Sequence, residues 1–276
     1  MSAPELDFLD ISGQRVAYRQ LGSGPAVLMI HGWPTHSWLW RDVMPPVAEA
    51  GNRAIAIDLP GFGASSKPLK HRYGFTFYDE IIEGFLGQLG IDDVAIVVHD
   101  LGGPVGLHWA VGNQERVRSI ALLNTLAYPD PSLAVKLFVA ICSTPGARSL
   151  LTSPRGIAFA MRFGVSDRSL MDDARLGPYQ EPFRSRDARR ALADTAKGLG
   201  PRGFETIEAG LRNLEIPMRI IYGTEDRILP DVGETMERVQ RDVVDCELTA
   251  LEGVGHFLQE ERGREIGDLL APFYAS

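Results

Sequence analysis

An aspartate, Asp100, stands where an apolar run gives way to two glycines and a helix-like stretch, in the string VVHDLGG over residues 97–103. A sharp turn from strand to helix lifts the residue at the turn above the sheet and exposes a nucleophile there. Gly102 suits this turn, because a side chain at that position would clash. The string therefore predicts a nucleophile at Asp100. The competing interpretation is an aspartate that caps the following helix.

A carboxylate nucleophile restricts the chemistry. Serine must lose a proton before it attacks, whereas a carboxylate is already ionised at neutral pH. Attack on a saturated carbon gives an alkyl ester, but attack on an ester or amide would give an anhydride. The expected substrates therefore carry a carbon–halogen bond or an epoxide. The alkyl ester must then be hydrolysed by an activated water.

A histidine and a second carboxylate follow later in the chain. His256 lies in the glycine-flanked string GVGHF after the last apolar run, and Asp226 follows the run at 218–222. The order nucleophile, acid, histidine is that of α/β-hydrolases. We expect His256, oriented by Asp226, to act as the general base on water. Glu225 is the rival acid, but an aspartate three residues past Gly223 occupies the loop position that this fold uses.

The string His31-Gly32-Trp33-Pro34 follows an apolar run directly. A loop at this place can aim backbone N–H groups at developing negative charge, and those of Trp33 and Leu101 form the expected oxyanion hole. The alternative is a turn with a well-packed histidine. The chemistry requires no metal and no organic cofactor.

The elements that would position these residues are read from hydrophobic patterns. An alternating segment, 6–20, predicts a β-hairpin. Short apolar runs predict strands buried on both faces of a parallel sheet, at 26–30, 54–57, 94–98, 119–123, 218–222 and 246–251. Helix-like stretches lie between them, at 40–50, 77–89, 103–111, 232–241 and 261–273. This alternation predicts the α/β class, with a mostly parallel, doubly wound sheet of about eight strands.

One long interval interrupts the alternation. About ninety residues separate the strand ending at Asn124 from the strand opening at Met218, which is too long for a structureless loop. Helix-like pieces within it lie at 133–141, 186–196 and 203–214. We expect a helical cap at 125–213, inserted into a core domain of residues 1–124 and 214–276. The cap would cover the carboxyl ends of the strands, where ligands bind in such sheets.

Net charge, cysteine count and the length of apolar runs limit the expected binding partners and location. The chain has 276 residues and a formal net charge of −8, which disfavours nucleic acid. Two cysteines give no disulfide framework, and the start lacks the pattern of a signal peptide, so a cytoplasmic location is expected. No apolar run approaches the roughly 20 residues of a membrane span. The expected partners are a small apolar organic substrate and water, with no membrane, and the expected state is a monomer or homodimer.

With these motifs in place, the sequence resembles the haloalkane dehalogenases of the α/β-hydrolase superfamily, from about residue 14 to the C-terminus. The matching strings are HGWPTHSWLWR at 31–41, DLPGFGASSKP at 58–68, VVHDLGG at 97–103 and GHFLQE at 255–260. The resemblance implies Asp100 as nucleophile, His256 as base and Asp226 as its acid. Some dehalogenases place a glutamate after the strand that here ends near Asn124, so the asparagine supports the later acid.

Epoxide hydrolases share this triad and are the alternative. They typically show a glycine two residues before the nucleophile, where this chain has Val98, and two cap tyrosines that protonate the opening ring. Tyr179 and Tyr128 are the candidates for that acid. A non-catalytic binding protein on the same fold is a lesser alternative, disfavoured by the intact triad.

The residue after the nucleophile is normally tryptophan in the dehalogenases, and its indole holds the departing halide; here it is Leu101. The Trp33 indole is the remaining candidate donor. One donor instead of two would weaken halide stabilisation by roughly 1–3 kcal/mol. The expected halide or substrate contacts are Trp33, Tyr179, Tyr128, Phe183 and Leu258.

Overall fold

Eight strands form one sheet in a computed structural model that describes residues 4–69 and 73–275. Their order across the sheet is β1-β2-β4-β3-β5-β6-β7-β8, and only the β1–β2 and β2–β4 pairings are antiparallel. The predicted fold class, a mostly parallel sheet of about eight strands, is confirmed. The strands are β1 (Asp7–Ile11), β2 (Gln14–Leu21), β3 (Ala26–Ile30), β4 (Arg53–Ile57), β5 (Val94–Asp100), β6 (Val117–Thr125), β7 (Met218–Gly223) and β8 (Cys246–Leu251).

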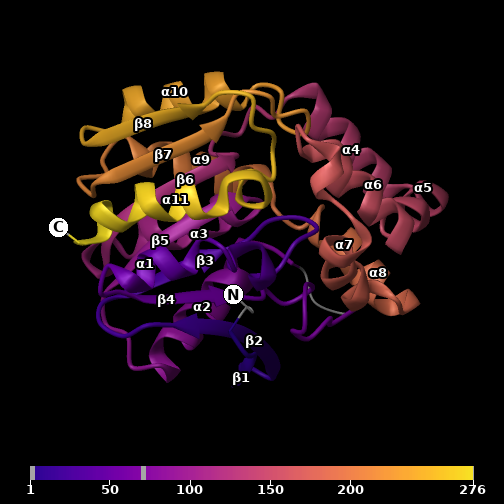
Figure 1. Ribbon diagram of the computed structural model, residues 1–276, viewed down its shortest axis with the longest axis horizontal. Coiled ribbons are helices and arrows are strands. Elements are labelled where there is room, and N and C mark those ends of the chain that lie inside the picture. Colours follow the sequence, from indigo (N-terminus) through magenta and orange to yellow (C-terminus); the bar gives the residue numbers. More distant parts are fainter. Residues whose placement is uncertain (1–3, 70–72, 276) are drawn as a thin grey trace.

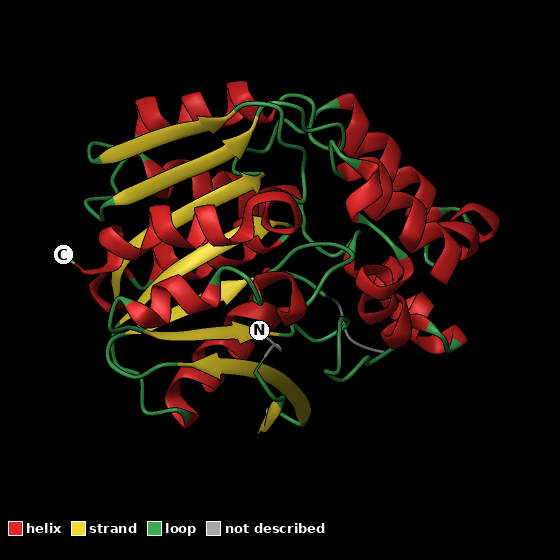
Figure 2. Ribbon diagram, viewed as in Figure 1, coloured by secondary structure: helices red, strands yellow, loops and turns green. Residues whose placement is uncertain are grey.

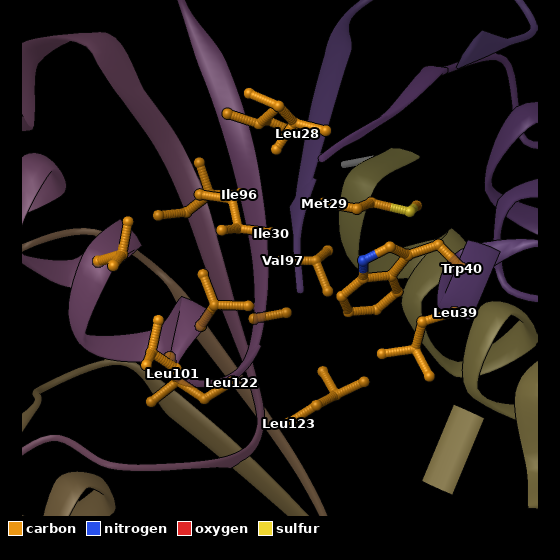
Figure 3. Close-up of a cluster of buried hydrophobic side chains, with 14 of the residues drawn as sticks. Leu28, Met29, Ile30, Leu39, Trp40, Ile96, Val97, Leu101, Leu122 and Leu123 are labelled. Carbon is orange, nitrogen blue, oxygen red and sulfur yellow. The ribbon is translucent and has the colours of Figure 1, made fainter. Parts of the chain in front are cut away.

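The central strands are apolar because helices cover both faces of the sheet. All residues of β3 and β5 are buried. Met29 and Val97 point toward Trp40 on one side, while Ile30 and Ile96 point to the other (Figure 3). The covering helices are α1 (Met44–Glu49), α2 (Phe75–Gln88), α3 (Gly102–Gly112), α9 (Pro201–Leu211), α10 (Val232–Asp242) and α11 (Leu258–Ala275). Helices α1 and α11 pack together, and α3 packs against α2 and α9.

The remaining α-helices form a separate group beyond the strand ends (Figure 1). They are α4 (Leu133–Ser143), α5 (Pro145–Leu151), α6 (Pro154–Gly164), α7 (Asp173–Gln180) and α8 (Arg186–Thr195). The arrowheads of the parallel strands point toward this group in Figure 2. The inserted helices therefore lie beyond the carboxyl ends of the parallel strands, and we call this group of helices the cap. Short 3-10 helices lie at Ser37–Trp40, Gln114–Arg116, Arg168–Leu170 and Glu181–Phe183.

Two element predictions differ from the structure. The expected helix at 40–50 is split: residues up to Trp40 form a 3-10 helix, and α1 begins only at Met44, with Pro45 and Pro46 in its first turn. The expected cap piece at 203–214 corresponds to α9, which packs on α3 of the core. We therefore propose that the cap ends near residue 200 instead of at 213.

Candidate active site

The main chain at Asp100 adopts a left-handed conformation at the end of β5, with φ of 50°. This conformation is unfavourable for a residue with a side chain and is typical of functional turns. The Thr125 hydroxyl donates a 2.6 Å hydrogen bond to the Asp100 carbonyl and holds the turn. The N-cap of α3 is Leu101, and no side chain caps this helix. The turn therefore has the geometry of a nucleophile elbow, the sharp strand-to-helix turn that the sequence predicts. The Asp100 carboxylate is not the N-cap of α3.

The Asp100 carboxylate is bound by backbone donors from two loops. The Trp33 N–H donates to Oδ1 at 2.6 Å. Hydrogen bonding by the Leu101 N–H is among the causes that lower the pKa of the Asp100 carboxyl. Gly32 permits this approach, because a Cβ at that position would lie 2.3 Å from both Cβ and Oδ1 of Asp100. The two predicted N–H groups thus converge on one carboxylate, as an oxyanion hole requires.

Gly32→Ala is therefore expected to push the carboxylate away from its donors. A misplacement of about 1 Å at a reacting group lowers turnover by about 100-fold, and we expect a loss of that order in kcat/KM. Gly112→Ala is the control, because a Cβ at that helical glycine meets nothing within 4 Å. A Gly32→Ala protein that folds and retains full turnover would contradict the tight approach.

His256 lies between two carboxylates. Its Nδ1 is 2.7 Å from Asp226 Oδ2, and its Nε2 is 3.5 Å from Asp100 Oδ2. The second distance is long for a direct hydrogen bond. The Nδ1–H donates to Asp226, which leaves Nε2 directed at the reactive carboxyl group. The structure thus brings together the three residues that the sequence predicts.

Asp226 is held firmly. Its Oδ1 accepts hydrogen bonds from the N–H groups of Ile228 and Leu229 at 2.8 and 2.7 Å. Its Oδ2 also accepts a 2.7 Å bond from the Asn124 side chain, whose own Oδ1 accepts from the Gly223 N–H. The rival, Glu225, is exposed, and its carboxylate lies 3.4 Å from the Ser166 hydroxyl and 3.8 Å from the Arg227 guanidinium. Asp226 is therefore the better placed acid, and Asn124 is its positioning partner.

Charge pairing sets the protonation of the site. Burial opposes the charge on His256, but the carboxylates of Asp226 and Asp100 outweigh it and raise the pKa of His256 to about 10. Burial also opposes ionisation of Asp100, but hydrogen bonding and charge from His256 dominate and lower its pKa. The resting site therefore holds an ionised Asp100 opposite an imidazolium.

These shifts predict how stability depends on pH. The pKa of His256 is raised in the folded state, so its contribution is present below about 6.5 and is lost as pH rises through about 10. The pKa of Asp100 is lowered, so its contribution is present above the ordinary value of 3.8 and is lost as pH falls through the folded value. We expect the free energy of unfolding to fall by roughly 2–4 kcal/mol from pH 7 to pH 11.

Urea denaturation across pH 3–11 measures this curve. Asp226→Asn should move the alkaline decline to lower pH, because the largest charge that raises the His256 pKa is gone. A native protein whose stability rises steadily from pH 7 to pH 10 would contradict the assigned charges.

Two contacts to the His256 loop escaped the sequence analysis. The carbonyl of His256 accepts a 2.9 Å bond from Nε2 of His99, which is fully buried. Burial lowers the pKa of His99 to about 3, so this histidine is neutral. The N–H of His256 donates to the Gly164 carbonyl, at the end of α6, at 2.6 Å. The position of His99 beside Asp100 was the available sequence signal for the His99 contact. No sequence signal indicated the Gly164 contact.

A cavity of about 470 Å³ lies over Asp100, between the core and the cap. Its walls are mostly aliphatic and aromatic, contributed by the elbow and by α4, α6 and α9. Among the described residues, Asp100 and Arg227 are the charged side chains that line it. The cavity therefore suits a small apolar molecule with its reacting carbon next to the carboxylate.

The expected substrate contacts divide into two groups. Trp33 and Tyr128 line the cavity. The Trp33 indole N–H, however, donates to the Leu192 carbonyl at 3.2 Å, and the Tyr128 hydroxyl donates to Asp242 at 2.9 Å. Both donors are thus engaged with protein acceptors.

Tyr179, Phe183 and Leu258 do not line the cavity, contrary to expectation. All three are fully buried in the packing between cap and core. The Tyr179 hydroxyl donates to Glu260, a buried carboxylate that also pairs with Arg41. Tyr179 is therefore a structural tyrosine here, and it is withdrawn as a ring-opening acid.

Comparisons with known proteins agree with this architecture. A family model described as alpha/beta hydrolase fold matches residues 25–263. A haloalkane dehalogenase of Sphingobium indicum is 30% identical, with 98% of this chain and 95% of the relative covered. Two solved structures share the fold. The haloalkane dehalogenase DatA of Agrobacterium tumefaciens is 23% identical with a TM-score of 0.86, covering 100% of this chain and 98% of its own. The epoxide hydrolase CorEH is 24% identical with a TM-score of 0.83, covering 98% of each chain. The chain belongs to the alpha/beta hydrolase fold family.

Proposed function

We propose that this protein is a hydrolase that cleaves carbon–halogen bonds through a covalent alkyl ester on Asp100. The observation that carries the proposal is the Asp100 carboxylate itself, which faces an apolar cavity with two N–H donors on one side and His256 on the other. The haloalkane dehalogenase relative supports the same reaction. The following steps derive from this geometry.

In the first step, the carboxylate displaces the halide from carbon. Oδ1 is held by the Trp33 N–H and is the atom positioned to become the ester carbonyl, so Oδ2 attacks. A C–O bond forms, the C–halogen bond breaks, and the halide leaves with the electron pair. No proton moves in this step, because Asp100 is already ionised.

In the second step, water hydrolyses the ester. Alkylation removes the Asp100 charge, which is one of the causes of the raised pKa of His256. His256 then releases its proton more readily and can accept one from water. The water oxygen attacks Cγ of Asp100 as His256 takes one proton from the water, and the N–H groups stabilise the oxyanion. The bond between Cγ and the alkyl oxygen then breaks, His256 returns the proton to the departing alkoxide to give the alcohol, and the restored Asp100 carboxyl releases its proton to solvent.

The leaving group determines which substrates are expected to react well. Leu101 has no side-chain donor, and the Trp33 indole is bonded to Leu192. With little protic assistance, a weakly basic halide departs more readily than a strongly basic one. We therefore expect iodo- and bromoalkanes to be turned over faster than chloroalkanes.

Epoxide hydrolysis is the second candidate. Two observations favour it: CorEH shares the fold, and position 101 lacks the indole of the dehalogenases. The ring oxygen needs a proton on opening, and Tyr128 is the tyrosine that lines the cavity among the described residues. Its bond to Asp242 would have to break first.

A substrate panel separates the two reactions. Halide release from 1-iodobutane, 1-bromobutane and 1-chlorobutane is measured beside diol formation from styrene oxide, with Asp100→Ala as the blank. We expect Asp100-dependent halide release that declines from iodide to chloride. Diol formation without halide release would replace the first proposal by the second, and neither product across the panel would overturn both.

A further inference from the structure

Three helices of the cap carry large apolar side chains in contact with solvent. These side chains lie on α4, α5 and α6, which adjoin one another in the cap (Figure 1). We call this surface the cap face. Its exposed members are Leu133 at 81%, Leu137 at 59%, Leu150 at 72%, Phe159 at 67% and Phe163 at 36%. Helix α4 is the most unusual element, because Cys142 is its one buried residue.

The apolar side chains of the cap face are grouped and are not scattered. Leu133 and Leu137 are four residues apart and share one side of α4. Phe159 and Phe163 have the same spacing on α6, and their rings stack with centroids 6.0 Å apart. Leu137, Phe159 and Phe163 also line the cavity above Asp100. The cap face is therefore continuous with the walls of the candidate active site.

The charge of this region is opposite to that of the whole chain. Residues 131–164 contain Lys136, Arg148, Arg155 and Arg162 and no acidic residue, although the chain has a net charge of −8. Arg162 lies 3.7 Å from Asp173, whereas Lys136, Arg148 and Arg155 have no carboxylate partner within the described ranges. Arg155 is four residues before Phe159, so cation and ring lie on the same side of α6.

We propose that the cap face docks on an anionic lipid bilayer, so that the cavity lies next to the lipid. Exposed leucine and phenylalanine beside unpaired lysine and arginine is the combination that places helices in the interface of an anionic membrane. No single described helix is long and apolar enough to span a bilayer. Helices α4 and α5 together have the length and apolar composition of a span, but they are bent by 106°. A short bent pair suits a position in the interface.

This inference revises the expectation of no membrane partner. That expectation rested on the short length of the apolar runs, which argues against a membrane-spanning helix. It does not concern a surface that forms only when three helices fold together. A second copy of this chain is the competing occupant. Two cap faces of the same positive sign would repel each other, whereas an anionic headgroup attracts them, so charge favours the lipid.

Vesicle flotation of the full chain tests the proposal directly. The probes are vesicles of phosphatidylcholine alone and vesicles of phosphatidylcholine with added phosphatidylglycerol, which carry a negative surface potential. We expect binding to the anionic vesicles that weakens with added salt, and much weaker binding to the neutral ones. Absence of binding to the anionic vesicles overturns the proposal.

Two double variants locate the binding surface. Leu133→Gln with Leu150→Gln removes two exposed apolar contacts that are outside the cavity lining, and Lys136→Glu with Arg155→Glu reverses two charges. Each is expected to weaken anionic vesicle binding by about tenfold or more. The matched control is Val244→Gln, since Val244 is 91% exposed just before the amino end of β8, away from the cap.

Vesicle binding equal to native in both double variants would show that another surface binds, and it would overturn the assignment. Analytical ultracentrifugation measures the oligomeric state and so tests the competing occupant, a second copy of this chain. A dimer that dissociates in Leu133→Gln with Leu150→Gln, together with no vesicle binding, would assign the cap face to a second copy. None of these measurements uses turnover, so failure here is distinguishable from failure of the proposed function.

Discussion

His256→Gln is expected to yield a protein that alkylates itself once and then stops. The attack by Asp100 needs no proton transfer, so the first step survives the loss of the imidazole. Hydrolysis of the ester does need the base, and removal of a general base lowers the rate by about 100- to 10,000-fold. The alkyl ester should therefore accumulate to one equivalent on Asp100.

Intact mass spectrometry after incubation with 1-bromobutane detects the butyl adduct, and peptide mapping locates it. Halide release should show a burst of one equivalent and then a slow phase. Asp100→Ala is the control without a nucleophile and should give neither adduct nor burst. His108→Gln is the matched histidine control, because His108 pairs with Asp79 on the core surface, and it should turn over normally. Native turnover by His256→Gln would disprove the assigned base.

Glu260→Ala is expected to destabilise the protein by about 3–5 kcal/mol, because it leaves a buried cation without its partner. The Glu260 side chain is fully buried, and Arg41 binds it through two hydrogen bonds of 2.5 and 2.7 Å. Tyr179 donates to the same carboxylate, and Arg175 donates to the Glu260 carbonyl at 2.9 Å. Loss of this group should loosen the contact between α7 and the core.

Urea denaturation monitored by tryptophan fluorescence measures this effect. Glu265→Ala is the matched control, since Glu265 forms an exposed ion pair with Arg262 on the same helix. A change within about 0.5 kcal/mol is expected for it. If Glu260→Ala were as mild as Glu265→Ala, the buried network would have no role in joining cap and core.

The core of the fold could be predicted because each central strand is a short apolar run closed by polar or glycine residues. Asp100, Asp226 and His256 lie just past such runs, so the ends of the strands brought them together as expected. The cap was harder. Helices α5 and α7 have seven and eight residues, too few for a helical period to stand out. Helix α9 was recognised, but an amphipathic pattern does not say which neighbour its apolar side meets.

The supporting contacts of the site were hidden for another reason. Glu260 and Arg41 are 219 residues apart in sequence, and His99 and His256 are 157 apart. The local strings do not identify these partners, and the only hint is that His99 directly precedes Asp100. Trp33 shows the same limit: its place beside the oxyanion loop was predicted correctly, but its indole is bonded to Leu192, a carbonyl 159 residues away.

The last carbonyl of α6 has a mechanical consequence. Gly164 accepts the main-chain N–H groups of both His256 and Phe257, at 2.6 and 3.3 Å. The cap and the loop that carries His256 are thus linked at a single carbonyl oxygen. An outward movement of the cap would displace the His256 imidazole from its alignment. An ester formed on Asp100 would then not be hydrolysed until the cap returned. The same fastening that shelters the intermediate also couples its breakdown to closure.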